Sequence, residues 1–229
     1  SMEPEFAIIC NPTSLHVQSA ISILSNQIPA LIEKPITNDL EQLDLFKSKA
    51  EKCNFPIMIG FQLRDHPHFM ILKEIINSGE LGYPISLNGF VGQYLPDWRP
   101  EIDYTLTSSA QKKLGGGVIL DLSHEIDIAI QVLGPPSTIF SCGGTYSELR
   151  IDTEDTAAII LEHNSGISNI QAIKLAGTLP PSAIPTIKST IGRSIEFNLF
   201  FISNNSKSTL LTDILSNSKK INGYQSHDH

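Results

Sequence analysis

The sequence predicts an α/β chain in two parts, a parallel sheet covered by helices followed by a mostly antiparallel open sheet. Two observations support this prediction. In residues 6–61, short apolar runs alternate with stretches in which apolar residues recur at helical spacing. From residue 138 onward, strand-like segments follow one another with few helices between them.

Three short apolar runs in the first part are typical of buried parallel strands. They are residues 6–10, 29–32 and 55–61. A helix is expected after each of the first two runs, and Thr37 or Asn38 is the expected N-cap of the second helix. The apolar positions of these helices are Val17, Ala20, Ile21 and Leu24 in the first, and Leu40, Leu43, Phe46, Ala50 and Cys53 in the second. Strand and helix therefore alternate, as in a parallel sheet.

The second part combines two helices with a series of strands. Helices are expected over residues 66–78 and 118–133, and between them Ile85, Leu87 and Val91 alternate as in a half-buried strand. Further strands are expected over residues 138–142, 156–162, 167–173, 186–191 and 194–201. This succession predicts a second, mostly antiparallel sheet.

These patterns divide the chain into residues 1–65, 66–203 and 204–229. The last segment is rich in Ser, Asn and Lys, so we expect a loosely ordered tail with one turn of helix near residues 210–215.

Composition excludes several classes of function. The net charge is −8 and the basic residues are scattered, which argues against a nucleic-acid partner. No apolar stretch approaches the roughly 20 residues that cross a bilayer, so no membrane partner is expected. The three cysteines, Cys10, Cys53 and Cys142, have no CxxC or zinc-ligand spacing. We expect them to be buried free thiols of a cytoplasmic protein that holds no metal.

Polar residues follow the first two predicted strands of the first part. Asn11 and Pro12 end one strand, with His16 just beyond, and Glu33 and Lys34 end the next. Ligands of an open parallel sheet bind at the carboxyl ends of its strands, so these residues are candidates for a binding site. The alternative for Lys34 is a solvated loop lysine.

A second candidate site lies in GGGVILDLSHEID, which spans residues 115–127. The glycines allow the backbone to approach a ligand closely and lead into the predicted helix. Asp121 and His124 are three residues apart and would share one side of that helix. A carboxylate beside a histidine suits a base that takes a proton from a hydroxyl, although a purely structural Asp–His pair is an equal alternative.

Five strings resemble consecutive signatures of the Gfo/Idh/MocA oxidoreductase family, named after glucose-fructose oxidoreductase and inositol dehydrogenase. They are AIICNPTSLH, IEKPI, GFQLR, GQYLPDWRP and LGGGVILDLSHEIDIAIQVLG. The resemblance runs in order from Phe6 to about Phe200. The string GQYLPDWRP is similar to members that act on amino sugars or their nucleotide derivatives.

The resemblance implies half of a Rossmann domain over residues 1–65 and an α/β substrate and dimerisation domain over 66–203. It implies NAD or NADP as cofactor, a sugar-like substrate and a homo-oligomer. By the family's motifs, the catalytic residues are Lys34, Asp121 and His124. The implied cofactor contacts are Asn11, Pro12, His16, Glu33, Lys34, Trp98 and Arg99, and the implied substrate contacts are Arg64, Tyr94, Asp121 and His124.

Three departures from the family pattern qualify this resemblance. The aspartate and histidine are three residues apart, whereas many members have four. No GxGxxG occurs, and the strand, glycine-rich turn and helix that carry it should precede Glu5. The second domain ends early, after Phe201. We therefore expect a fragment that binds NAD(P) weakly, because backbone N–H groups of the glycine-rich turn bind the pyrophosphate.

The resulting prediction is hydride transfer between NAD(P) and a secondary alcohol of a sugar, amino sugar or cyclitol. His124, oriented by Asp121, would take the hydroxyl proton, and Lys34 would polarise the carbinol oxygen. The alternative is a catalytically inactive fragment that acts as a sugar-binding or dimerisation module. A zinc or Ser-His-Asp hydrolase is a weaker alternative, because the sequence has no GxSxG elbow.

Overall fold

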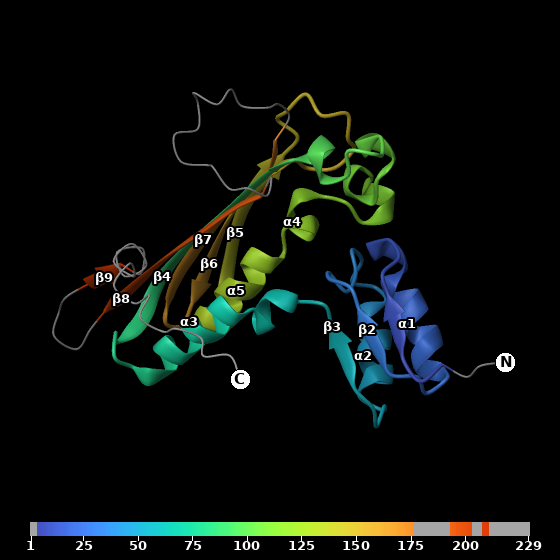
Figure 1. Cartoon of the computed structure of the whole chain (residues 1–229), viewed down its shortest axis with the longest axis horizontal. Helices are drawn as coiled ribbons and strands as arrows, with labels where there is room; N and C mark the ends of the chain where they lie inside the picture. Colours follow the sequence, from blue (N-terminus) through green and yellow to red (C-terminus); the bar gives the residue numbers. More distant parts are fainter. Residues whose placement is uncertain (1–3, 176–192, 203–207, 211–229) are drawn as a thin grey trace, which may run out of the picture.

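The computed structural model describes residues 4–175, 193–202 and 208–210, which form two units around separate sheets (Figure 1). The smaller unit is a three-stranded parallel sheet in the order β1-β2-β3. Its elements are β1 (Ala7–Ile9), α1 (His16–Ser25), β2 (Ala30–Ile32), α2 (Leu43–Ala50) and β3 (Ile57–Ile59). A 3-10 turn, η1 (Thr13–Leu15), precedes α1.

Helices α1 and α2 bury the apolar side of this small sheet. The buried residues that form this core are Ile9, Val17, Ala20, Leu24, Ala30, Ile32 and Phe46. Residues directly across the strands, Ile8, Leu31 and Met58, lie on the opposite side, where Ile8 and Met58 are exposed. In the described part of the chain, the small sheet is therefore covered by helices on one side only.

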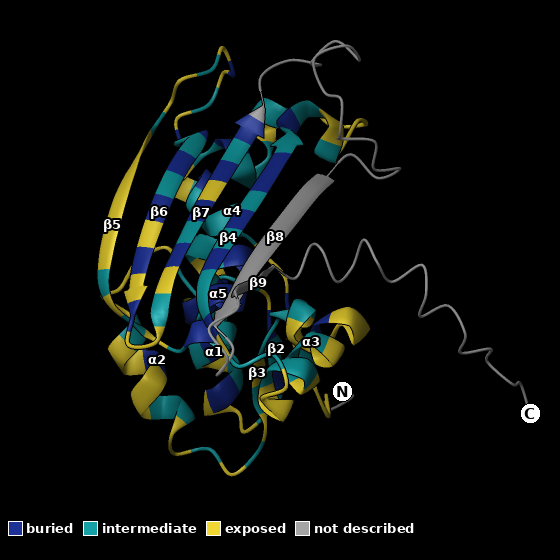
Figure 2. Cartoon of the chain, turned by 90° about the vertical axis from the view of Figure 1, so that its left-hand side faces the viewer, coloured by how far each residue is buried: buried dark blue, intermediate teal, exposed yellow. Residues whose placement is uncertain are grey.

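The larger unit has a six-stranded sheet in the order β5-β6-β7-β4-β8-β9 in its described residues. Its strands are β4 (Tyr83–Tyr94), β5 (Pro136–Gly144), β6 (Thr156–His163), β7 (Gly166–Leu175), β8 (Arg193–Ile202) and β9 (Ser208–Leu210). The pair β4 and β7 is parallel, and the other pairs are antiparallel. Figure 2 shows β6 with buried residues alternating with intermediate and exposed ones, as expected for a sheet covered on one face.

Three helices pack on the buried face of the large sheet. They are α3 (Pro67–Ser78), α4 (Val118–Asp121) and α5 (His124–Leu133). The 3-10 turn η2 (Gln62–Asp65) connects β3 of the small unit to α3, and four further 3-10 turns complete the described part of the large unit: η3 (Leu95–Trp98), η4 (Tyr104–Leu106), η5 (Ser108–Ala110) and η6 (Lys112–Leu114). Its core joins the helices to strands β4, β6 and β7 through Phe69, Leu87, Val91, Val118, Leu122, Ile128, Ala129, Leu133, Ala157, Ile159, Leu161, Ile170 and Ala172. Within the described ranges, each helix is too short or too polar to cross a lipid bilayer.

The predicted fold class is confirmed, with local corrections. The N-cap of α2 is Gln42 instead of Thr37 or Asn38, and Thr37 Oγ1 bonds the backbone of Asp39 in a local turn. The segment 118–133 is two helices, since Leu122 leaves helical geometry with φ −105° and ψ 33°. Residues 208–210, which we expected in the tail, extend the sheet as β9. The strand predicted over 186–191, and all but Leu210 of the predicted helical turn, lie outside the described residues.

The expectation of buried cysteines is also wrong. Cys10 and Cys142 are exposed and Cys53 is half-buried, and each is a free thiol. Cys10 follows β1 directly at its carboxyl end, and Cys142 lies in β5, which has a single neighbour in the sheet. Both positions lie at an edge of the packed structure, where apolar sequence neighbours do not ensure burial.

Candidate active site

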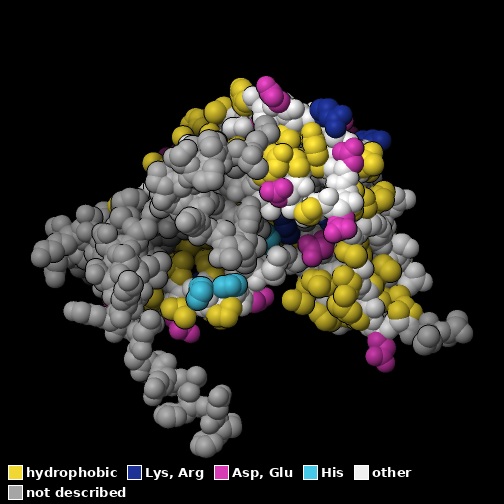
Figure 3. Space-filling model, turned by 45° about the horizontal axis from the view of Figure 1, so that its top comes forward, with side chains coloured by type: hydrophobic (Ala, Val, Ile, Leu, Met, Phe, Trp, Pro, Cys, Tyr) yellow, Lys and Arg dark blue, Asp and Glu magenta, His cyan; other side chains and the backbone are white. Residues whose placement is uncertain are grey.

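A cavity of about 690 Å³ lies between the two units. Its wall on the small unit comes from the segments that follow β1 and β2, and its wall on the large unit comes mainly from the η3–η6 connection and α4. Figure 3 shows the surface hollowed there, with acidic and basic side chains close together. Eight of the residues proposed from sequence line the cavity: Asn11, Pro12, His16, Glu33, Lys34, Trp98, Arg99 and Asp121.

His16 ties together the two strand-end segments of the small unit. It is 2% exposed, and its ring nitrogens lie 2.8 Å from the Pro35 carbonyl oxygen and 2.8 Å from that of Asn11. Asn11 in turn donates its side-chain amide hydrogen to Ser19 Oγ at 2.8 Å. The imidazole thus has a structural role, since it fixes the segment after β1 against the segment after β2.

Lys34 reaches from the small unit to the large unit. Its Nζ donates to the backbone carbonyl oxygen of Asp121 at 2.5 Å, and its backbone N–H donates to the Glu33 carboxylate at 3.2 Å. The Lys34–Pro35 peptide is cis. An ammonium group held at the mouth of the parallel strands can donate a hydrogen bond to an oxygen of a ligand in the cavity.

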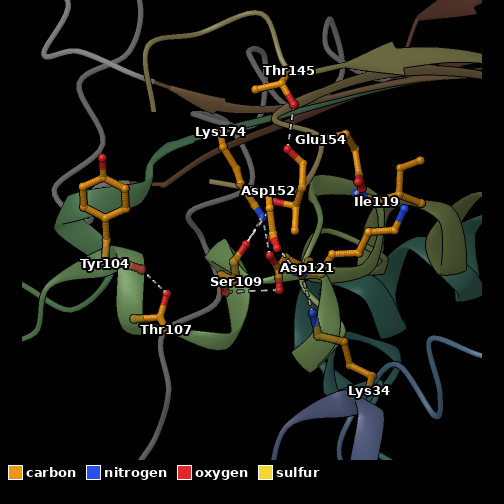
Figure 4. A network of polar contacts seen from close by, with 12 residues as sticks. Lys34, Tyr104, Thr107, Ser109, Ile119, Asp121, Thr145, Asp152, Glu154 and Lys174 are labelled. Carbon is orange, nitrogen blue, oxygen red and sulfur yellow. Dashed lines mark hydrogen bonds and ion pairs between the residues drawn. The ribbon is translucent and has the colours of Figure 1, made fainter. Parts of the chain in front are cut away.

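Asp121 connects the cavity to the core of the large unit. Its Oδ2 lies 2.7 Å from Lys174 Nζ, and its Oδ1 accepts a 3.3 Å hydrogen bond from Ser109 Oγ. Lys174 is fully buried and also donates to the Ser109 carbonyl oxygen at 2.7 Å (Figure 4). Sequence analysis missed Lys174, although it continues the inward-facing alternation of Ile170 and Ala172 along β7.

His124 begins α5, immediately after the break between the two helices. It is 2% exposed and does not line the cavity, and its ring meets the Phe61 ring edge-on at 5.8 Å. The expectation that Asp121 and His124 share one side of a continuous helix is wrong, because the helix breaks at Leu122. The Asp121 carboxylate is paired with Lys174 and accepts a hydrogen bond from Ser109.

Arg64 and Tyr94, the remaining residues proposed from sequence, do not line the cavity. Arg64 forms a bidentate pair with the buried Asp127, with Nε 2.9 Å from Oδ2 and Nη2 2.5 Å from Oδ1. The hydrogen bonds to Asp127 raise the pKa of Arg64, although partial burial opposes this. The Arg64 guanidinium also lies over the Phe61 ring at 5.1 Å. The η2 turn is therefore fixed to α5 close to His124.

Trp98 and Arg99 contribute the aromatic and basic part of the large unit's wall. Arg99 is exposed at the end of η3, and Trp98 is half-buried. Among the described residues, the buried indole N–H of Trp98 has no hydrogen-bond partner.

The glycine run has a different role from the one we expected. A Cβ on Gly115 would lie 2.7 Å from Thr13 Cβ, and one on Gly116 would overlap the Ser108 carbonyl oxygen. A Cβ on Gly117 would meet the Glu154 carboxylate, which accepts a hydrogen bond from Ile119 N in the first turn of α4. The glycines therefore allow segments of the chain itself to pack closely, whereas we expected close approach to a ligand.

Two family models match consecutive parts of the chain. A model described as an oxidoreductase family with an NAD-binding Rossmann fold matches residues 1–61, and the GFO/IDH/MocA C-terminal domain matches residues 69–173. The first range contains the three strands of the small sheet, and the second contains the cavity-lining residues of the large unit.

Similar proteins include dehydrogenases of cyclitols and sugars. A scyllo-inositol 2-dehydrogenase (NAD(+)) from Bacillus subtilis is 31% identical over 69% of this chain and 45% of its own length. A D-apiose dehydrogenase from Rhizobium rhizogenes is 26% identical over 82% of this chain and 54% of its own length. The chain spans about half the length of the curated relatives it matches.

A similar solved structure is the WlbA dehydrogenase from Bordetella pertussis, in complex with NADH and UDP-GlcNAcA. It has a TM-score of 0.71 and 18% identity, and the match covers 87% of this chain and 56% of that one. At this identity the likeness concerns the fold.

Proposed function

Because this chain belongs to the Gfo/Idh/MocA family of oxidoreductases, we propose that it carries the reaction site of an NAD(P)-dependent dehydrogenase. The substrate would be a secondary alcohol of a sugar, amino sugar or cyclitol. The observation that carries this proposal is the position of Lys34, whose Nζ extends from a parallel strand end to Asp121 across the cavity. Similar dehydrogenases include scyllo-inositol and D-apiose enzymes, and the WlbA structure holds NADH.

The cavity fits the nicotinamide end of a dinucleotide. Its lining combines strand-end residues of the small unit with Arg99 and Trp98 of the large unit. We assign the nicotinamide ring and its ribose to Asn11, Pro12, His16, Glu33, Lys34, Trp98 and Arg99. The dinucleotide, when bound, supplies the hydride chemistry, and the protein supplies position and charge.

Within this site, Lys34 donates a hydrogen bond to the carbinol oxygen and stabilises negative charge on it. His124 remains the proposed proton acceptor, and its ring is buried beside Phe61, next to the residues that line the cavity. In this proposal Arg64 does not bind the substrate, because Asp127 holds its guanidinium. The Arg64–Asp127 pair instead fixes the connecting turn η2 to α5 of the large unit.

A non-enzymatic sugar-binding or dimerisation module is the alternative, and the resemblance to dehydrogenases does not favour it.

Pairing of two copies is a separate proposal. The outer face of the large sheet exposes Phe140 and Ile160 at 61% and 44%, directly across a strand pair. Exposed apolar residues on neighbouring strands favour association through this face. Light scattering of Phe140→Asp against the wild type tests it, and a wild-type monomer would exclude it.

We also propose that the protein works in the cytoplasm, on the ground that its three cysteines are free. Subcellular fractionation of the native host tests this assignment.

The division into domains at residue 65 stays a prediction. Limited proteolysis near residues 62–68 tests it.

The proposed function is tested by binding and turnover on the same samples. Titration calorimetry with NAD⁺, NADH and NADP⁺ measures affinity, and a panel of inositols, aldoses and amino sugars measures reduction of the dinucleotide. Because the sequence holds no GxGxxG turn, we expect weak binding of NAD⁺ or NADP⁺, and turnover of at least one polyol only when the dinucleotide is in large excess. Lys34→Ala should abolish turnover but leave binding, and Lys113→Met, at an exposed lysine outside the cavity lining, is the control. No binding of any dinucleotide by the wild type would contradict the proposal.

A further inference from the structure

Lys174 is a buried cation that the proposed reaction does not use. Its side chain has no exposed surface, yet its ammonium group contacts two oxygens, Asp121 Oδ2 and the Ser109 carbonyl oxygen, each at 2.7 Å. A buried ammonium is stable only when its charge is paired and its hydrogens are bonded. Both of its partners line the cavity, whereas Lys174 itself does not.

The position of Lys174 in β7 explains how a buried residue of the sheet contacts residues that line the cavity. Lys174 is next to the last residue of β7, and across the parallel pair it lies opposite Gln93 of β4, which lines the cavity. Its backbone N–H donates to the Asp155 carbonyl oxygen at 2.6 Å, which fixes the strand end under the β5–β6 connection. The base of the Lys174 side chain is therefore held by the sheet, and its ammonium is directed at η5 and α4 (Figure 4).

Two lysines contact Asp121, each at a different group of the residue. Lys174 holds the carboxylate from the core side, and Lys34 holds the main-chain carbonyl from the small unit at 2.5 Å. Asp121 is the last residue of a single helical turn, so the direction of its carbonyl is fixed less by the helix than by the anchoring of its side chain. Lys174 thus pairs with the carboxylate, while Lys34 donates to the carbonyl of the same residue.

We propose that Lys174 is a positioning residue: by holding the Asp121 carboxylate toward Ser109, it fixes the Asp121 carbonyl and thereby the Lys34 ammonium in the cavity. Only the activity part of this inference rests on the proposed dehydrogenase function. The contacts among Lys34, Asp121 and Lys174 do not depend on it.

Chemical labelling of Lys34 tests the proposal without any substrate or cofactor. The acylation rate of the Lys34 amine by acetic anhydride at one fixed pH is measured by peptide mass spectrometry, with exposed Lys113 as internal reference. In Lys174→Met, the carboxylate loses its cation and turns to Lys34, which keeps that amine protonated. We expect its acylation to slow at least threefold relative to Lys113.

A second change separates positioning from loss of structure. In the double variant Asp121→Asn/Lys174→Met no carboxylate remains to capture Lys34, so labelling should return to within twofold of wild type. Lys174→Gln, which keeps a hydrogen-bond donor but no charge, serves if Lys174→Met does not fold. A purely structural lysine would lower the unfolding temperature in all variants and leave the relative labelling of Lys34 unchanged. Unchanged labelling in folded Lys174→Met or Lys174→Gln overturns the proposal.

Turnover supplies an independent measurement. If the protein oxidises a polyol, Lys174→Met should lower kcat at least tenfold with little change in KM for the dinucleotide, and Asp121→Asn/Lys174→Met should recover part of kcat. A larger effect on KM than on kcat would also overturn the proposal. If the wild type oxidises no substrate, the proposed function fails, and the labelling result still decides the role of Lys174.

Discussion

The two walls of the cavity are built in different ways. On the small unit, Asn11 and Lys34 follow β1 and β2 directly, within a few residues of the strands that position them. On the large unit, Asp121 depends on Lys174 from a strand more than fifty residues later in the chain, and on Ser109 from a 3-10 turn. The first wall is therefore specified by local sequence, and the second by contacts between segments that are distant along the chain.

Removing the lysine of the small unit's wall should have the largest effect. Lys34→Ala deletes the ammonium proposed to act on the carbinol oxygen, and we expect kcat to fall about 10²- to 10⁴-fold with dinucleotide affinity mostly retained. Steady-state kinetics and calorimetry measure the two quantities. His124→Asn, at the buried ring proposed as proton acceptor, should flatten the rise of rate with pH. Turnover unchanged by both substitutions would require a different assignment of the chemistry.

The close packing of the large unit's wall should be nearly as sensitive. In Gly116→Ala, the new Cβ would overlap the Ser108 carbonyl oxygen and lie 2.8 Å from that of Ser109, so the backbone has to shift. We expect a loss of about 3 kcal/mol in the free energy of unfolding, measured with urea. Gly79→Ala is the matched control, because Gly79 has positive φ but no atom within 4 Å of the added Cβ; its expected cost is about 1 kcal/mol. Equal losses would show that steric crowding at Gly116 is unimportant.

The ion pair between the connecting turn η2 and α5 should have an intermediate effect. Arg64→Met leaves the buried Asp127 carboxylate without its guanidinium, and we expect a loss of about 2 kcal/mol, between the values typical of exposed and buried ion pairs. Thermal unfolding measures the loss, with Arg150→Met at an exposed arginine as control. Asp127→Asn/Arg64→Met should recover part of the stability. If Arg64→Met matches its control, the pair contributes little to the junction between the units.

The smallest expected effect concerns the connection that supports the large unit's wall. Burial alone raises the pKa of Asp155, but hydrogen bonds from Ser147, Tyr146 and Thr156 outweigh it, so the pKa lies below its ordinary value. A depressed pKa contributes stability that is complete above the unfolded value of about 3.9 and is lost as pH falls through the folded value.

Asp155→Asn should therefore cost about 1 kcal/mol at neutral pH, and the difference from wild type should shrink below about pH 4. Urea unfolding at a series of pH values measures both. Thr145→Ala in the same connection, whose hydroxyl donates to the Thr153 carbonyl oxygen, is the control, since it carries no ionisable group. A difference that stays constant into acid would contradict the assigned role of the Asp155 charge.

The residues of the small unit's wall could be predicted from the sequence, whereas the contacts that build the large unit's wall could not. The alternation of apolar runs and helical stretches predicted the small sheet, and the rule for parallel strand ends selected Asn11, His16 and Lys34, all of which line the cavity. Lys174 was not predicted, because lysines are almost always exposed, and its place in the inward-facing alternation after Ile170 and Ala172 is a weaker signal than its residue type. The break at Leu122 was missed since the segment 118–133 retains helical periodicity on both sides of it.

The position of β4 at the centre of the large sheet has a consequence for biosynthesis. This strand pairs with β7 on one side and β8 on the other, both of which come much later in the chain, whereas β1, β2 and β3 pair with their successive neighbours. Contacts between distant segments form slowly, and domains fold as the chain leaves the ribosome from its N-terminus. During translation, the Lys34 segment can therefore fold with its own sheet before the strand that carries Lys174 has been synthesised, and the Asp121 contact is completed only afterwards.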